Sequence, residues 1–112
     1  MNATAERFYT QEPLLRNLVS ACQKELGALE VWLFGSRARG DNEPDSDWDL
    51  LAVLPDEVPD DSMGCEKVWE IGKRSGVYTD LIAVRDSDFR EMSTAVTSLC
   101  YQVADEGVRL DG

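Results

Sequence analysis

Two aspartates separated by a single residue are the feature of the sequence that most directly suggests chemistry. Asp47 and Asp49 open the segment DWDLLAVL, which is otherwise apolar, and residues two apart in a strand project from the same face. Aspartate is depleted in strands, and two like charges on one face raise each other's pKa unless a cation neutralises them. Because Mg²⁺ binds a few carboxylates together with substrate phosphates, the pair indicates a magnesium site.

A third carboxylate is expected from a neighbouring strand, and Asp80, within the apolar segment YTDLIAV, is the candidate. Two carboxylates can bridge a pair of metal ions about 4 Å apart, while the third binds one metal and also takes a proton from the acceptor. The alternative is that Asp80 only caps the end of its strand. The other acidic positions are interpreted as solvated loop charges: Asp41, Glu43, Asp45 and residues 56–61.

A turn suited to phosphate binding is predicted just before the aspartates. The apolar strand at 29–34 ends at Gly35 and Ser36, and a short helical turn follows, so backbone N–H groups face an incoming anion. Glycine permits close approach of the backbone, the Ser36 hydroxyl can donate to a phosphate oxygen, and Arg37 and Arg39 add positive charge. A Gly-Ser turn with arginines is by itself more often a solvated loop, and the aspartates that follow favour the phosphate site.

The elements that must position these residues follow from the spacing of apolar side chains. A chain of 112 residues is long enough for one hydrophobic core and too short for two independent domains, so the pattern predicts a single α/β domain. Helices are predicted at 14–26, between Pro13 and Gly27, at 61–75, and from Ser87 or Asp88 to Gly107. Strands are predicted at 29–34, 47–54 and 77–84, with a short edge strand at 108–110.

Large apolar residues outside the predicted site are assigned to the core. Trp48 lies between the two aspartates and therefore points to the opposite face of the sheet, where packing is favoured over base stacking. Trp32 and Trp69 are interpreted in the same way. Two apolar helix stripes are predicted, one formed by Cys65, Val68, Trp69 and Gly72 and the other by Phe89, Met92, Val96, Leu99, Cys100 and Val103.

The charge balance disfavours one class of substrate. The chain has 11 basic residues against 22 acidic ones, a formal net charge of -11, and such a surface repels nucleic acid, so no direct nucleic-acid binding is expected. The sequence shows no basic leader followed by an apolar core and no apolar window of membrane length, so a cytoplasmic protein without a membrane anchor is expected. Cys22, Cys65 and Cys100, without any histidine, fit neither a disulfide framework nor a zinc site and are expected to be buried.

The segment GSRARGDNEPDSDWDLLAV, residues 35–53, closely resembles the signature of the minimal nucleotidyltransferases of the DNA polymerase beta superfamily. A Gly-Ser pair, an Ala-Arg-Gly turn, a short variable loop and Ser-Asp-x-Asp follow in the order typical of that family. The resemblance implies a small mixed sheet flanked by helices, with residues 1–112 forming one nucleotidyltransferase domain. Many relatives carry a basic residue in the variable loop, where this chain has Asn42 and Glu43, so Arg37 and Arg39 would have to supply the phosphate contacts.

The same resemblance assigns roles to the site residues. Gly35 and Ser36 would bind the triphosphate, Asp47 and Asp49 would ligate the metals, and Asp80 matches the third acidic position. Family members of this size resemble antitoxins encoded beside HEPN-domain toxins, whose reported role is to transfer AMP from ATP to a toxin tyrosine. The resemblance therefore implies a Mg²⁺-dependent protein adenylyltransferase with a HEPN toxin as its partner.

Physical arguments agree with a protein acceptor. A chain this short has no second lobe with which to enclose a small acceptor, and its acidic surface suits a more basic partner. Two alternatives remain: nucleotidyl transfer to a small hydroxylated molecule such as an aminoglycoside, which would need a dimer that builds a closed pocket, and a non-catalytic antitoxin that acts by occlusion. The sequence leaves open the base preference and whether the chain forms a homo-oligomer or a hetero-oligomer.

Overall fold

A four-stranded sheet in the order β3-β2-β1-β4 forms the centre of the part of the chain that the structure describes. The structure is a computed structural model and describes residues 3–59 and 65–111. Its strands are β1 (Glu30–Phe34), β2 (Trp48–Leu54), β3 (Thr79–Arg85) and β4 (Val108–Arg109). β1 runs antiparallel to both β2 and β4, whereas β2 and β3 are parallel. This mixed sheet confirms the predicted fold class, an α/β (α+β) sheet flanked by helices.

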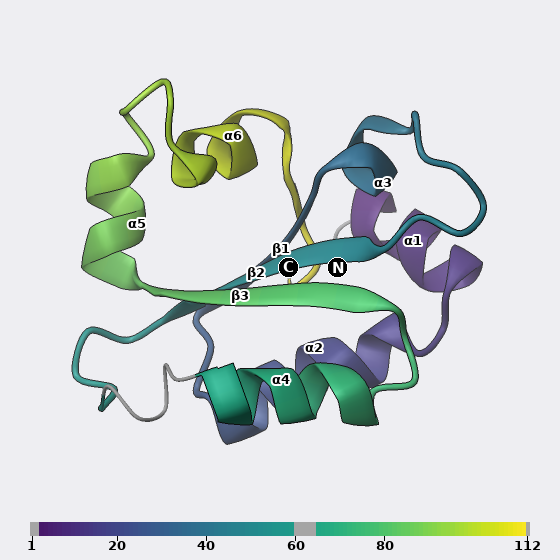
Figure 1. The fold of residues 1–112 in the computed structure, drawn as a ribbon, viewed down its shortest axis with the longest axis horizontal. Helices are drawn as coiled ribbons and strands as arrows, with labels where there is room; N and C mark the ends of the chain where they lie inside the picture. The colour runs from purple at the N-terminus through teal and green to yellow at the C-terminus, as the bar shows by residue number, and fades with distance from the viewer. Residues whose placement is uncertain (1–2, 60–64, 112) are drawn as a thin grey trace.

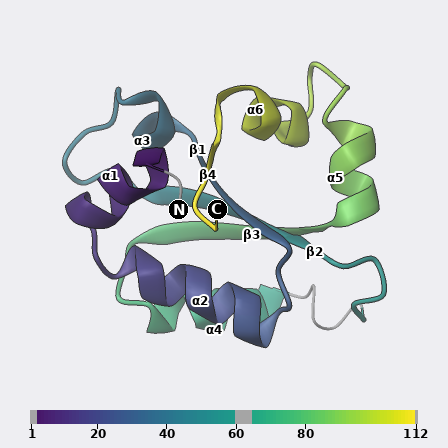
Figure 2. The same ribbon diagram turned by 180° about the vertical axis from the view of Figure 1, so that it is seen from behind.

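Helices cover both faces of the sheet (Figure 1). They are α1 (Ala3–Gln11), α2 (Leu15–Glu25), α3 (Ser36–Arg39), α4 (Cys65–Arg74), α5 (Asp86–Met92) and α6 (Leu99–Glu106). α2 and α4 lie against one face, and α5 and α6 lie over the other, which is also seen from behind in Figure 2. Within the described ranges, no helix has the length and apolar character needed to cross a membrane.

β2 is the most deeply buried element, because it lies between two strands and beneath helices on both faces. Residues 50–54 are all inaccessible to solvent, and their side chains enter two hydrophobic clusters in alternation. The cluster towards α2 and α4 includes Leu15, Leu18, Leu50, Leu54 and Ile71, and the cluster towards α5 and α6 includes Leu51, Val53, Phe89, Cys100 and Val103. Charged residues are therefore confined to the beginning of this strand.

Most of the predicted elements are confirmed within one or two residues. The helix predicted at 14–26 is α2, the three long strands are present, and β4 is the predicted short edge strand beside β1. Trp48 is 5% exposed, as expected of a core residue, and its ring lies edge-on to that of Phe8. Cys22 and Cys100 are buried, whereas the side chain of Cys65 and residues 60–64 of the predicted helix and acidic loop lie outside the description.

The helix α1 was not predicted, because the first 13 residues contain no Leu, Ile or Val to mark an apolar stripe. Ala5, Phe8 and Tyr9 are nevertheless buried, at the spacing of one helix face, and the Tyr9 hydroxyl donates to the carbonyl of Leu110. The apolar contacts of a few residues, together with a long-range hydrogen bond, hold this helix against the rest of the domain.

The prediction of one continuous helix from Ser87 or Asp88 to Gly107 is wrong, because the chain breaks at residues 93–98 between α5 and α6. Ser93 and Thr94 donate their hydroxyls to carbonyls three residues earlier, a local alternative to helical pairing. Ser98 then caps α6 by accepting from the Tyr101 N–H. The predicted stripe is interrupted in consequence: Val96 is 72% exposed, and Met92 and Leu99 are also exposed.

The predicted start of that helix is also different. α5 begins at Asp86, so its N-cap position is Arg85 and not Ser87 or Asp88. The Ser87 N–H donates to the carboxylate of Asp56 at 2.8 Å. The end of α6 at Gly107 is as predicted.

The apolar stripe predicted for α4 is wrong at Trp69. Val68 and Ile71 face the core, while Trp69 is 62% exposed and carries the Lys73 ammonium over its ring, 4.5 Å from the centroid. Among the described residues β3 is the outermost strand on this side of the sheet, so no further strand covers the Trp69 indole beside it. Trp32 is partly buried against Phe89.

A carboxylate near the end of the described chain fastens β4 to β1. Asp111 accepts hydrogen bonds from the Val31 N–H at 2.9 Å and from Arg109 Nε at 2.7 Å. Burial alone would raise the pKa of Asp111, but these hydrogen bonds and the charge of Arg109 outweigh it, so the pKa lies below its usual value. The ionised carboxylate therefore stabilises the folded chain.

We predict that Asp111→Asn lowers the free energy of unfolding by about 1–2 kcal/mol at neutral pH, because it weakens charge-assisted hydrogen bonds at a nearly buried position. A depressed folded pKa contributes stability that is present above the unfolded pKa of about 3.9 and is lost as the pH falls through the folded pKa. The difference from wild type should therefore shrink in strong acid. Urea unfolding at several pH values measures it, with exposed Asp105→Asn as the control; an equal effect of both substitutions contradicts the assignment.

Candidate active site

The predicted phosphate-binding turn joins β1 to the short helix α3. Gly35 has φ 75° and ψ -158°, a conformation open only to glycine, and the helical turn that was predicted after it begins at Ser36. The carbonyl of Gly35 accepts hydrogen bonds from the N–H groups of Ala38 and Arg39, both at 3.1 Å. The N–H groups of the first turn thus point back toward the end of β1.

Gly35 also lies directly against one of the predicted metal ligands. Phe34, its neighbour in the chain, is paired with Asp49 across the β1–β2 ladder. A Cβ atom at Gly35 would lie 2.3 Å from Asp49 Oδ2, closer than any real contact of that kind. The glycine therefore brings the turn and the Asp49 carboxylate together at one end of the sheet.

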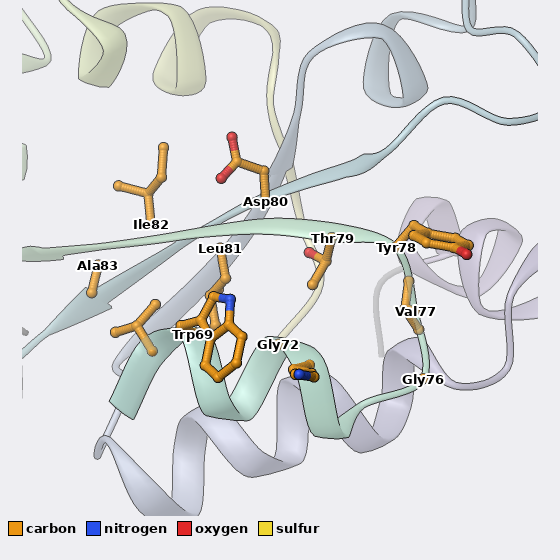
Figure 3. A pocket seen from close by; sticks show the side chains of 12 residues that line it. Trp69, Gly72, Gly76, Val77, Tyr78, Thr79, Asp80, Leu81, Ile82 and Ala83 are labelled. Carbon is orange, nitrogen blue, oxygen red and sulfur yellow. The ribbon is translucent and has the colours of Figure 1, made fainter. Parts of the chain in front are cut away.

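The parallel register of β2 and β3 pairs Asp49 with Asp80. Side chains at paired positions of adjacent strands project from the same face, about 5 Å apart at their bases. Figure 3 shows the Asp80 carboxylate on the same side of β3 as Ile82, opposite to Trp69 and Leu81. Both carboxylates thus lie on the face that α5 and α6 cover further along the strands.

Asp47 lies just before β2 rather than in it, and its side chain is exposed. Its charge nevertheless acts on Asp49. Burial, the charge of Asp80 and the charge of Asp47, in that order, raise the pKa of Asp49, and the charge of Arg39 partly offsets them. The charges of the other two predicted aspartates thus act on Asp49, and the charge of Arg39 offsets them only in part.

The donor set fits a magnesium ion that takes part of its coordination from a nucleotide. Carboxylate oxygens are the hard ligands that Mg²⁺ prefers, and one or two of them with substrate phosphates commonly suffice. Among residues 3–59 and 65–111, no group of three or more acidic, histidine or cysteine side chains lies close enough together to hold a metal by itself. Asp49 and Asp80 are the two carboxylates that the register places side by side, with Asp47 at the margin.

The two arginines predicted to bind phosphate both contact other parts of the protein. Arg37 donates to the carbonyls of Ser46, at 2.9 Å, and Pro44, at 3.0 Å, and its guanidinium lies 4.4 Å from the centre of the Trp48 ring. It thereby fastens the loop that carries Asp47. The sequence does not reveal the hydrogen bonds to Pro44 and Ser46 or the contact with Trp48, because all of them depend on the path by which the loop folds back.

Arg39 is held less firmly than Arg37. Its guanidinium forms ion pairs with Asp41, at 3.2 Å, and with Glu106 of α6, at 2.9 Å, and all three side chains are accessible to solvent. Exposed ion pairs of this kind contribute little to stability and exchange easily.

A family model described as a nucleotidyltransferase domain matches residues 15–110 of this chain. The chain belongs to the nucleotidyltransferase domain family. The match includes the Gly35–Ser36 turn and all three aspartates, and it confirms that the chain is a nucleotidyltransferase domain, as the resemblance implied. No curated protein sequence matches the chain.

Solved structures with the nucleotidyltransferase fold resemble this chain at low sequence identity. A toxin–antitoxin structure with AMP-PNP matches with a TM-score of 0.58 and 23% identity, covering 86% of this chain and 72% of that one. A putative nucleotidyltransferase from Sulfolobus solfataricus matches with a TM-score of 0.57 and 23% identity over 97% and 87% of the two chains. A mutant of the toxin–antitoxin pair MntA–HpeT matches with a TM-score of 0.56 and 20% identity over 86% and 71%. At these identities the likeness establishes the shared fold.

We predict that Gly35→Ala destabilises this nucleotidyltransferase by about 2–4 kcal/mol, because the new methyl group meets Asp49 and the backbone is strained. Gly40→Ala is the matched control, since Gly40 also has a positive φ but open space around its would-be Cβ atom. It should cost only about 1 kcal/mol. Chemical unfolding measures both; equal losses would show that the contact with Asp49 is unimportant.

Removal of the Asp49 charge should stabilise the protein when divalent ions are absent. A carboxyl whose pKa is raised in the folded state binds its proton more tightly there, so its ionisation costs stability at pH values above that pKa. Asp49 is partly solvated, so we expect Asp49→Asn to raise the melting temperature by only roughly 1–3 °C in EDTA at pH 7.5. With Mg²⁺ and AMP-PNP, wild type should gain more than the variant. Differential scanning calorimetry tests both effects, and a lower melting temperature of the variant in EDTA would contradict the electrostatic argument.

Proposed function

We propose that this nucleotidyltransferase transfers AMP from ATP to a hydroxyl group of a partner protein in a Mg²⁺-dependent reaction. The pairing of Asp49 with Asp80 beside the Gly35 turn is the observation that carries the proposal. It combines carboxylates whose charge Arg39 compensates only in part, and which a divalent ion would neutralise, with a backbone turn suited to a triphosphate. The toxin–antitoxin structure with AMP-PNP, an analogue of ATP, supports the choice of nucleotide.

The chemistry is an in-line displacement at the α-phosphorus of ATP. The acceptor oxygen forms a bond to the α-phosphorus, the bond from that phosphorus to the bridging oxygen of the β-phosphate breaks, and pyrophosphate leaves. The hydroxyl proton passes to a carboxylate, for which we assign Asp80, since it is exposed at the margin of the sheet. Mg²⁺ bound by Asp47, Asp49 and Asp80, singly or as a pair, would neutralise charge on the phosphates and orient them.

Gly35 and Ser36 would receive the triphosphate, with Arg39 as the principal cationic contact. The ion pairs of Arg39 are exposed, and its charge already acts on Asp49, so it can turn to a phosphate at little cost. Arg37 would have to give up its hydrogen bonds to Pro44 and Ser46 before it could do the same. We therefore assign Arg37 chiefly to holding the loop of Asp47 and only secondarily to the nucleotide.

A protein is the acceptor that best suits this site. Asp47 and Asp80 are exposed, so a small molecule would be poorly enclosed, whereas a docked protein would cover the site and exclude water from it. The net charge of -11 favours a basic partner. We propose that the partner is a cognate HEPN-type toxin, that a tyrosine hydroxyl receives AMP, and that the modification is the antitoxin activity; two of the similar structures are of toxin–antitoxin pairs.

The test is to incubate the protein with ATP labelled on its α-phosphate, Mg²⁺ and the product of the neighbouring gene, and to measure label on that product. We expect Asp47→Ala and Asp49→Ala to lower the rate at least about 100-fold, because each removes a metal ligand. Asp45→Ala is the matched control, since Asp45 is an exposed aspartate of the same loop. EDTA should abolish labelling.

Three results would contradict the proposal. Undiminished labelling in Asp49→Ala would place the reaction elsewhere. Neutralisation of the partner without any label, retained in Asp47→Ala, would favour an antitoxin that acts by occlusion. Transfer to an aminoglycoside but to no protein would favour the small-molecule acceptor.

A further inference from the structure

β3 forms an edge of the sheet that lies beside the candidate active site. β3 pairs with β2, and none of the described residues forms a strand on its other side. The Trp48 N–H donates to the carbonyl of Tyr78, so the backbone groups of residues 78, 80, 82 and 84 face β2. By alternation, those of Thr79, Leu81 and Ala83 face outwards, where another strand could pair with them.

A largely apolar groove runs along this edge, and Lys73 and Asp80 are the charged residues in its lining. It lies between α4 and β3 and has a volume of about 780 Å³. Val68, Trp69, Leu81 and Ala83 contribute to its lining, and Figure 3 shows Trp69 beside β3 on the α4 side. Both aromatic residues at this edge are exposed, Trp69 by 62% and Tyr78 by 85%.

Side chains along a strand project alternately from its two faces, and this alternation relates the edge to both the groove and Asp80. A strand added beside β3 would have the same pleat, so a residue opposite Asp80 would project onto the carboxylate face, with its Cβ about 5 Å from that of Asp80. The residues before and after it would project onto the other face, into the groove. One added strand would thus present one side chain to the candidate active site and anchor its two neighbours.

We propose that the acceptor protein binds here as an added strand, with its hydroxyl residue opposite Asp80 and apolar residues on either side of it in the groove. The inference rests on the proposed function and adds that the acceptor segment binds in an extended conformation. The hydroxyl would then stand beside the carboxylate that takes its proton, while oxygen attacks the α-phosphorus and pyrophosphate leaves. Main-chain hydrogen bonds would supply affinity, and the groove would supply specificity.

Charge favours a partner over a second copy of this chain at the edge. Each copy carries a formal charge of -11, so two copies would repel each other, whereas a basic segment would be attracted. The acceptor segment is accordingly expected to be extended, basic overall and apolar immediately around its hydroxyl residue.

Two peptides of identical composition test the inference. In Gly-Gly-Lys-Val-Tyr-Val-Lys-Gly-Gly the valines adjoin tyrosine and would enter the groove. In Gly-Gly-Val-Lys-Tyr-Lys-Val-Gly-Gly the lysines adjoin tyrosine and would have to enter the groove instead. With ATP and Mg²⁺, we expect kcat/KM for AMP transfer to the first peptide to exceed that for the second by at least about tenfold. Equal values overturn the inference.

Variants of the protein locate the binding site. Trp69→Ala should raise KM for the first peptide about tenfold while leaving kcat unchanged, because it removes a wall of the groove and no group near the phosphates. Val96→Ala is the matched control, an exposed apolar side chain in the segment between α5 and α6. An unchanged KM in Trp69→Ala, or no transfer to the first peptide by the wild-type protein, overturns the inference.

Methylation of the peptide backbone tests the added strand itself. N-methyl groups on both valines would block antiparallel pairing with β3, and an N-methyl group on tyrosine would block parallel pairing. One of the two modifications should abolish transfer and the other should be tolerated. Equal tolerance of both overturns the added strand.

Failure of this inference can be told apart from failure of the proposed function. If the neighbouring gene product is labelled in an Asp49-dependent manner, but the two peptides are used equally and Trp69→Ala has no effect, the proposed function is supported and the docking mode is contradicted. If neither the gene product nor the peptides are labelled, the proposed function and the docking mode are both contradicted. A dimer in sedimentation equilibrium that Trp69→Ala dissociates would assign the edge to a second copy of this chain and overturn the inference.

Discussion

The parallel pairing of β2 with β3 is the constraint on which the candidate site depends. It sets Asp49 beside Asp80, a juxtaposition of like charges that would separate if the two strands were free to shift. The apolar continuation of β2 prevents this, since residues 50–54 are buried on both faces and a shift of the strand by one residue would exchange the two faces. Hydrophobic burial thus holds in place a group of charges that is unfavourable by itself, and a bound cation would relieve it.

Sequence periodicity and residue chemistry predicted the parts that are locally determined. The buried strand β2, the amphipathic α2 and the Gly35 turn all have strong local patterns, and each lies within one or two residues of its predicted position. The pairing of Asp80 with Asp49 could be expected only as an association between neighbouring strands, because register depends on contacts distant in the sequence.

The errors come from competing long-range or local polar interactions. The break at residues 93–98 reflects hydroxyl groups that bond to nearby carbonyls, which apolar spacing does not register. Trp69 was assigned to the core because indole is apolar, yet β3 is an edge strand with little width to cover it. The partners of Arg37 depend on the path of a loop, so sequence alone could not separate an anchor from a phosphate ligand.

Because Arg37 anchors the loop, related chains can differ in the length of its outer part without displacing Asp47. The hydrogen bonds to Pro44 and Ser46 and the contact with Trp48 fix the segment immediately before Asp47. Glu43 adds two hydrogen bonds to Ser46, so residues 41 and 42 are the part of the loop outside this anchor. Lengthening a surface loop costs little conformational entropy. Insertions at 41–42 can therefore accumulate in related chains and remodel the outer surface beside the site, while the aspartate behind the anchor keeps its place.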